Sequence, residues 1–149
     1  MLRTAKVSDV RKALGEFFSD AAHHDVVTAI RRYDNEEAFL IGRDMLLALV
    51  EAKSPAAGAE VVREEDGSYT LCCRELDLVA NDMDYEKAVE QLLEHVRAYA
   101  DLFFEQPAVY LKDKSRRCHL PLLMGSMLVD NDGELRRLLG LPVDAPPPV

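Results

Sequence analysis

The sequence predicts an α+β protein in two parts: a small mixed module, then an antiparallel β-meander packed on a long helix. Apolar residues recur at helical spacing in some stretches, and runs of β-branched and aromatic residues separated by polar turns lie between them. A proline with small residues and a glycine at 54–58 marks a boundary. We therefore expect a module at residues 1–53, a linker at 54–58, a second domain at 59–141 and a disordered proline-rich tail at 142–149.

The charge is distributed unevenly along the 149 residues, whose net charge is -9. Residues 1–53 carry eight Lys/Arg against nine Asp/Glu, whereas residues 54–149 carry ten against eighteen. The acidity therefore belongs to the second part, which leaves room for a local basic face on the first. Such a face matters because net negative charge by itself disfavours binding to nucleic acid.

Compartment and membrane association follow from composition. No apolar run approaches the roughly 20 residues that a membrane-spanning helix needs, and the first residues lack the apolar core of a secretory signal. Three cysteines without metal-type spacing indicate free thiols in a reducing compartment. We expect a cytoplasmic protein that makes no contact with a membrane.

An amphipathic helix is predicted near the start of the chain. Ser8 is a good N-cap, Asp9 complements the helix dipole, and the helix should run to about His23. Gly15 is costly in a helix interior, so we expect it to mark a close packing contact. The predicted apolar stripe comprises Val10, Ala13, Leu14, Phe17, Phe18 and Ala21.

Two strand-like runs at 26–33 and 38–41 predict a hairpin, and a short apolar helix follows at 44–53. This order, preceded by Val7-Ser8-Asp9-Val10-Arg11-Lys12-Ala13-Leu14, resembles the Phd/YefM antitoxin family. The resemblance implies dimerisation through this module and contact of its first helix with operator DNA. It carries the DNA-contact role specifically to Ser8 and Arg11.

The second part predicts strands at 59–64, 69–74 and 76–80, with an Asp66-Gly67 turn between the first two. A capped helix then runs to about Glu105, before Pro107. Its buried stripe comprises Ala88, Val89, Leu92, Leu93, Val96, Tyr99 and Phe103.

This meander and helix resemble the HicB-like antitoxin domain, a partial ribonuclease-H-like fold. The resemblance is carried by Asp66-Gly67-Ser68-Tyr69, Glu75-Leu76 and Asp84-Tyr85-Glu86-Lys87-Ala88. It implies a non-catalytic module that binds a protein partner.

Beyond Pro107 the pattern predicts two extra strands, at 109–111 and 118–123, on either side of a basic turn. A final short helix should open at Asp132 and end at Gly140. The basic turn is either solvated, which we favour, or a contact for an acidic partner or RNA. Its cations are Lys112, Lys114, Arg116 and Arg117.

Candidate DNA contacts lie around the first helix, where cations and backbone N–H groups suit phosphate. The alternative is an ordinary surface helix with solvated charges. The candidates are Arg3, Lys6, Ser8, Arg11 and Lys12.

We expect no catalytic residue, cofactor or metal site. Asp20, His23 and His24 could share a helix end, but a solvated helix end is the better interpretation. A metal-dependent nuclease using Asp66 or Asp82 is a weaker alternative, since turn formation and helix capping explain both carboxylates.

The prediction is an antitoxin-like, non-enzymatic transcriptional regulator. It would form a homodimer or higher homo-oligomer, bind operator DNA through the first module and hold a toxin protein through the acidic second part. The alternative is a dimeric adaptor protein without DNA binding, which the overall acidity favours.

Overall fold

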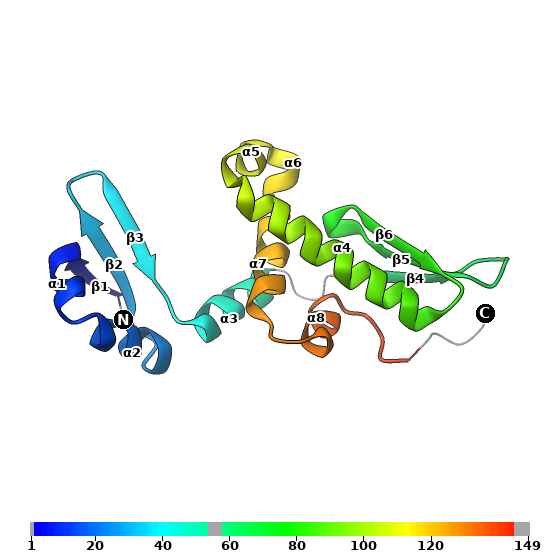
Figure 1. The fold of residues 1–149 in the computed structure, drawn as a ribbon, viewed down its shortest axis with the longest axis horizontal. Coiled ribbons are helices and arrows are strands. Elements are labelled where there is room, and N and C mark those ends of the chain that lie inside the picture. Colours follow the sequence, from blue (N-terminus) through cyan, green and yellow to red (C-terminus); the bar gives the residue numbers. More distant parts are fainter. Residues whose placement is uncertain (1, 54–57, 145–149) are drawn as a thin grey trace. The chain divides into compact units, whose positions relative to one another are not determined.

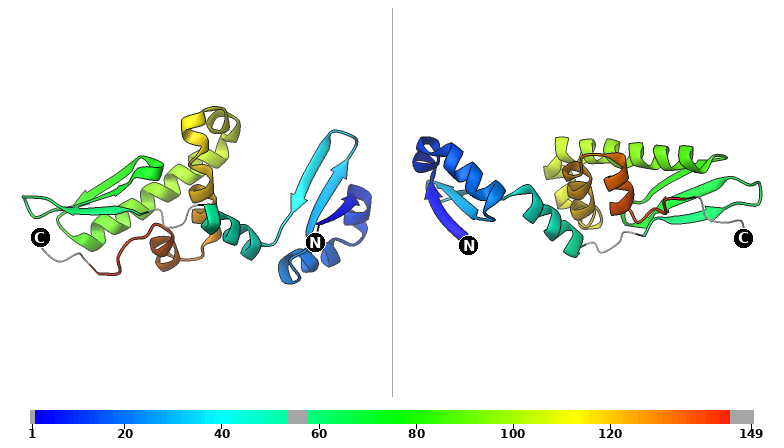
Figure 2. Two further views of the ribbon diagram at one scale, coloured as in Figure 1. Left: turned by 180° about the vertical axis from the view of Figure 1, so that it is seen from behind. Right: turned by 90° about the horizontal axis from the view of Figure 1, so that it is seen from below.

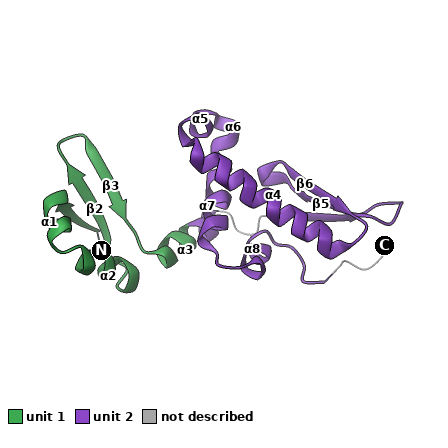
Figure 3. Cartoon of the chain, in the orientation of Figure 1, with its two compact units in different colours: residues 1–49 green, residues 50–149 purple. Residues whose placement is uncertain are grey.

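The computed structural model describes residues 2–53 and 58–144 and has the predicted α+β fold (Figure 1). The chain divides into two compact units, residues 1–49 and residues 50–149 (Figure 3). Within the described residues, each unit contains one three-stranded sheet. Most of the predicted linker, 54–57, and the tail from residue 145 lie outside the described residues, and the predicted domain boundaries stay a prediction.

Unit 1 is built on a sheet of order β1-β2-β3. β1 runs parallel to β2, with Lys6 opposite Arg31, and β2 and β3 form the predicted antiparallel hairpin. Helix α3 begins in this unit and continues past its boundary. The elements are β1 Leu2–Lys6, α1 Val7–Lys12, α2 Leu14–His23, β2 Val27–Arg32, β3 Glu36–Leu40 and α3 Arg43–Lys53.

The predicted first helix is two helices. Ala13, at φ -131° and ψ 37°, interrupts it between α1 and α2. The expected cap at Ser8 is wrong, because β1 leads directly into a helix that already begins at Val7, and Ser8 lies in its first turn. Only part of the predicted stripe is buried: Phe17 is buried, whereas Phe18, the next residue of α2, is mostly exposed.

The expected packing role of Gly15 is also wrong, because a Cβ at this position would have no neighbour within 4 Å. The close approach in unit 1 is at Gly42, between β3 and α3. A Cβ at Gly42 would overlap the backbone carbonyl oxygen of Ala21 in α2. Backbone atoms cannot swing aside as the end of a side chain can, so this position requires glycine.

Unit 2 begins with the predicted meander, in the order β4-β5-β6. Leu71 and Cys73 point into the core, as the alternation of β5 predicts, and Gly67 occupies the turn at φ 88°. A 3₁₀ turn, η1, joins β5 to β6. The elements are β4 Glu60–Arg63, β5 Tyr69–Cys73, η1 Arg74–Leu76 and β6 Leu78–Asp82.

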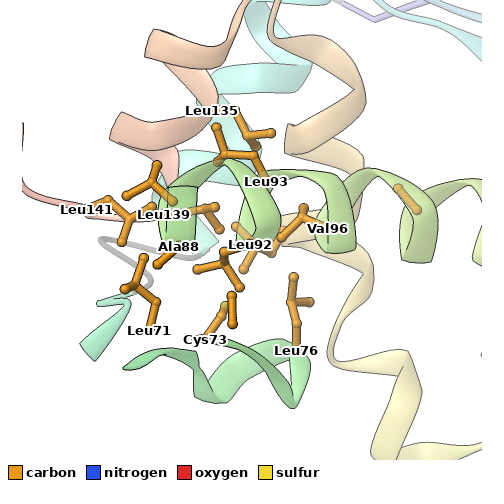
Figure 4. Packing of buried hydrophobic residues seen from close by; sticks show 14 of the residues in the cluster. Leu71, Cys73, Leu76, Ala88, Leu92, Leu93, Val96, Leu135, Leu139 and Leu141 are labelled. Carbon is orange, nitrogen blue, oxygen red and sulfur yellow. The ribbon is translucent and has the colours of Figure 1, made fainter. Parts of the chain in front are cut away.

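Helix α4, Tyr85–Glu105, lies along one face of this sheet (Figures 1 and 2). The helix is capped, as predicted, and the cap is Asp84: its carboxylate accepts hydrogen bonds from the backbone N–H groups of Glu86, at 2.9 Å, and Lys87, at 3.3 Å. The predicted stripe is buried except for Tyr99, which is half-buried. Figure 4 shows Leu92 and Val96 of this helix packed with Leu71 and Leu76.

The strands predicted at 109–111 and 118–123 are wrong, because 109–111 lie in α5 and 118–123 form a turn followed by the start of α7. Short apolar runs do not distinguish a buried strand from a buried helix. The local signals here are Pro107 at the first position of α5 and Asp113 as the N-cap of α6. The final predicted helix is confirmed as α8. The elements are α5 Pro107–Lys112, α6 Lys114–Arg117, α7 Leu120–Leu128 and α8 Asp132–Leu138.

Within the described residues, no helix is both long and apolar enough to cross a bilayer.

Replacement of Gly42 by alanine tests the contact between this residue and α2. We expect Gly42→Ala to destabilise unit 1 by about 1–3 kcal/mol, because the new methyl group forces the backbone apart. Hydrogen exchange of the α2 and β2 amides measures this. Gly15→Ala is the matched control: its methyl group meets open space, so stability should stay the same or rise by up to about 1 kcal/mol.

Candidate nucleic-acid interface

The start of α1 lies at a basic edge of unit 1. Parallel pairing brings the carboxyl ends of β1 and β2 together, so Lys6 lies opposite Arg31. A hollow of about 670 Å³ opens there, lined by residues 4–9 and 31–34. Two of the five predicted DNA-contact residues, Lys6 and Ser8, therefore line one surface.

Arg11 and Lys12 lie farther along α1, in its last turn. Both side chains are exposed, as are those of Lys6 and Ser8. Within the described part of the chain, no ion pair engages Lys6, Arg11 or Lys12. These cations are therefore available to an external anion, although the exposed carboxylate of Asp9 lies on the same short helix.

Arg3 has a different environment from the other four predicted residues. Its Nη1 donates to Asp20 Oδ2 at 2.9 Å, and its guanidinium carbon lies 3.9 Å from the centre of the Phe17 ring. Nε and Nη2 are buried without a hydrogen-bond partner. The side chain thus links β1 to α2 inside unit 1, a contact that the sequence analysis missed.

Two further arginines, Arg31 and Arg32, line the hollow. Each has a carboxylate partner across the hairpin. Arg31 Nε lies 3.1 Å from Glu37 Oε2, and Arg32 Nε lies 3.6 Å from Glu36 Oε2. Because both pairs are exposed, they contribute little stability, and either arginine can exchange its partner for a phosphate.

The carboxylates of the nuclease alternative have structural roles in unit 2. Asp66 Oδ1 accepts from the backbone N–H of Ser68 at 2.9 Å and from its hydroxyl at 2.7 Å. These bonds hold the pKa of the Asp66 carboxyl below its ordinary value. Asp82 accepts from Gln91 Nε2 at 3.0 Å and from the backbone N–H of Asp84 at 2.9 Å. Across residues 2–53 and 58–144, no group of three or more His, Cys, Asp or Glu could hold a metal ion.

The sequence analysis did not predict a partly buried polar pair in unit 2. The hydroxyl of Tyr99 lies 2.7 Å from Nδ1 of His119, beside a cavity of about 240 Å³ that Asp77 and Arg116 also line. Burial lowers the pKa of His119. The helical stripe of α4 contained Tyr99, but nothing in the sequence pairs it with a histidine twenty residues away.

Comparisons with known proteins identify the family of this chain. A PHD-like family model, described as antitoxin of toxin-antitoxin, RelE/RelB, TA system, matches residues 1–141. The chain belongs to this antitoxin family. An antitoxin has a toxin as its partner, so this protein is one component of a toxin–antitoxin system. A comparison with curated protein sequences gives no significant match.

A solved structure has the same fold. It is the antitoxin part of a proposed toxin/antitoxin system from Syntrophomonas wolfei subsp. wolfei, with a TM-score of 0.76 and 18% sequence identity. The similarity covers 91% of this chain and 95% of that one. The α+β fold is therefore common to both proteins, at an identity too low to carry residue roles across.

The contacts of Arg3 predict that this side chain stabilises unit 1 of the antitoxin. We expect Arg3→Ala to destabilise unit 1 by about 1–3 kcal/mol, because it removes a charge-assisted hydrogen bond and a cation–π contact. Hydrogen exchange of the β1 and β2 amides measures the loss. Lys6→Ala removes an exposed cation from the same strand and should leave exchange unchanged. Equal effects of the two substitutions would contradict a structural role for Arg3.

Proposed function

We propose that this antitoxin is a non-enzymatic, cytoplasmic transcriptional regulator that binds operator DNA through unit 1 and its toxin through acidic unit 2. The observation that carries the DNA-binding proposal is the set of exposed cations without ion pairs at α1 and its start. Lys6, Arg11 and Lys12 supply charge for phosphates, and Ser8 supplies a hydroxyl at the same edge.

A second copy of the chain is part of the proposal. Few side chains of unit 1 are fully buried, and a module of this size is marginally stable alone. Leu2 and Phe39 are 64% and 61% exposed. By strand alternation and register they lie on the sheet face opposite Arg3, which contacts α2. Covering these two apolar side chains with a second copy would stabilise the unit, which supports a homodimer.

The toxin contact is assigned to unit 2 from its charge. Residues 54–149 carry eighteen acidic against ten basic side chains. Such a surface attracts a basic partner and speeds its association. A basic toxin ribonuclease would fit this surface.

Binding to the DNA upstream of its own gene tests the regulatory role. We expect specific binding in a mobility-shift assay that weakens steeply between two salt concentrations, because phosphate contacts release counterions. Arg11→Ala should reduce affinity about 3- to 10-fold and lower the salt slope by about one, as the loss of one phosphate contact does.

The control for that experiment is Arg43→Ala, which removes an arginine outside the proposed interface. Thermal unfolding shows that each variant is folded. A folded, dimeric wild type that binds no DNA would favour the adaptor alternative, to which the net charge of -9 already lends weight.

Purification of the tagged protein from its native host tests the toxin contact. We expect one basic protein to co-purify in a fixed ratio and to dissociate as salt is raised, since the proposed attraction is electrostatic. Mass spectrometry identifies it, and its expression alone should arrest growth unless this chain is co-expressed. A preparation without any specific partner would count against the antitoxin role.

A further inference from the structure

Unit 2 contains a basic groove although the unit as a whole is acidic. Four of the ten cations of residues 54–149 fall within 112–117. The structure turns this segment into the end of α5 and the whole of α6. Beside α6 lies a groove of about 730 Å³, lined by Lys53, Lys114, Arg117, Glu75, Cys118, Leu120 and Pro121.

The carboxylate within the basic segment is already engaged. Asp113 is the N-cap of α6: its Oδ1 accepts from the backbone N–H of Ser115 at 2.9 Å and from its hydroxyl at 2.6 Å. Its Oδ2 lies 3.8 Å from Arg116 Nε, in an exposed pair. Asp113 and Arg116 therefore offset each other and leave the other cations uncompensated.

Three cations converge on the groove without such partners. Lys114 and Arg117 lie three residues apart and so share one face of α6, and Lys53 lines the same groove. No ion pair within the described residues engages any of the three. Glu75 is the carboxylate that the described lining contributes. Like charges that line one groove repel one another, and an anion bound there relieves that repulsion.

We propose that this groove binds backbone phosphates of DNA, as a second contact surface in addition to unit 1. The inference rests on the proposed DNA-binding function. A chain of net charge -9 approaches a polyanion only where cations are concentrated. Among the described residues, unit 1 offers Lys6, Arg11 and Lys12 as exposed cations without ion pairs, and the groove adds three more. Phosphate contacts carry no base information, so the groove adds affinity without adding sequence preference.

The double variant Lys114→Gln/Arg117→Gln tests the groove in the full-length protein. The probes are a fluorescent duplex of the upstream DNA and a shuffled duplex of equal length, titrated over a salt series. We expect about a 10-fold or greater loss of affinity for both duplexes. The salt slope should fall by about two, because two phosphate contacts are lost.

The matched control is Lys87→Gln/Arg137→Gln, which removes the same charge from exposed positions elsewhere in unit 2. It should bind both duplexes nearly as wild type does. Equal losses in the two double variants would overturn the proposal, because net charge alone would then explain the effect.

Failure of the groove and failure of the proposed function give different results. If the groove variant binds DNA as wild type does while Arg11→Ala weakens binding, the groove is no DNA contact and the role of unit 1 stands. If the groove variant keeps DNA binding but loses its co-purifying protein, the groove holds an acidic segment of that partner. The proposal that the groove binds DNA is then overturned. If wild type binds neither duplex, both proposals fall.

Discussion

The parallel pairing of β1 with β2 is the constraint on which unit 1 depends. Parallel neighbours cannot be joined by a tight turn, so the chain must cross from the end of one strand to the start of the other. Helices α1 and α2 make that crossing, and α2 lies on the sheet face where Arg3 meets Phe17 and Asp20. The same pairing aligns the carboxyl ends of both strands, which puts Lys6 opposite Arg31. One topological requirement thus creates the small core, the basic edge and the open opposite face.

Unit 2 has a different strand connectivity. Its strands are antiparallel and closely connected, so α4 needs only to cover one face of the sheet. The cluster that results is far larger than the core of unit 1, and it includes Phe103, Leu123 and Leu135 from three helices. Stability resides mainly in this unit because burial of apolar area is the dominant favourable contribution to folding.

Sequence reasoning succeeded where one local signal dominated. The Asp66-Gly67 turn, the Asp84 cap and the long stripe of α4 each have a spacing that one structure satisfies. It failed at Ser8, because the extent of β1 depends on a partner strand more than twenty residues away. It also failed at 118–123, because an apolar run alone does not choose between strand and helix.

In the candidate site, too, local features could be predicted from the sequence, whereas contacts between residues remote in sequence could not. Exposure of Ser8, Arg11 and Lys12 could be expected from their place on an amphipathic helix, and exposure of Lys6 from its charge just before that helix. The pairing of Arg3 with Asp20, and the convergence of Lys53 with Lys114 and Arg117, join residues remote in sequence. Such contacts follow from tertiary packing, which periodicity does not encode.

The shortness of α1 has a consequence for regulation. Six residues are too few to form a stable helix in water, so α1 owes its order to β1 before it and to the burial of Val10. β1 is an edge strand, held by hydrogen bonds to β2 alone in the described sheet. Local opening of that edge would release strand and helix together. The fraction of molecules with the edge closed would then set the population that is able to bind DNA. A second copy that closes the edge would thereby raise the apparent affinity for DNA while touching no base.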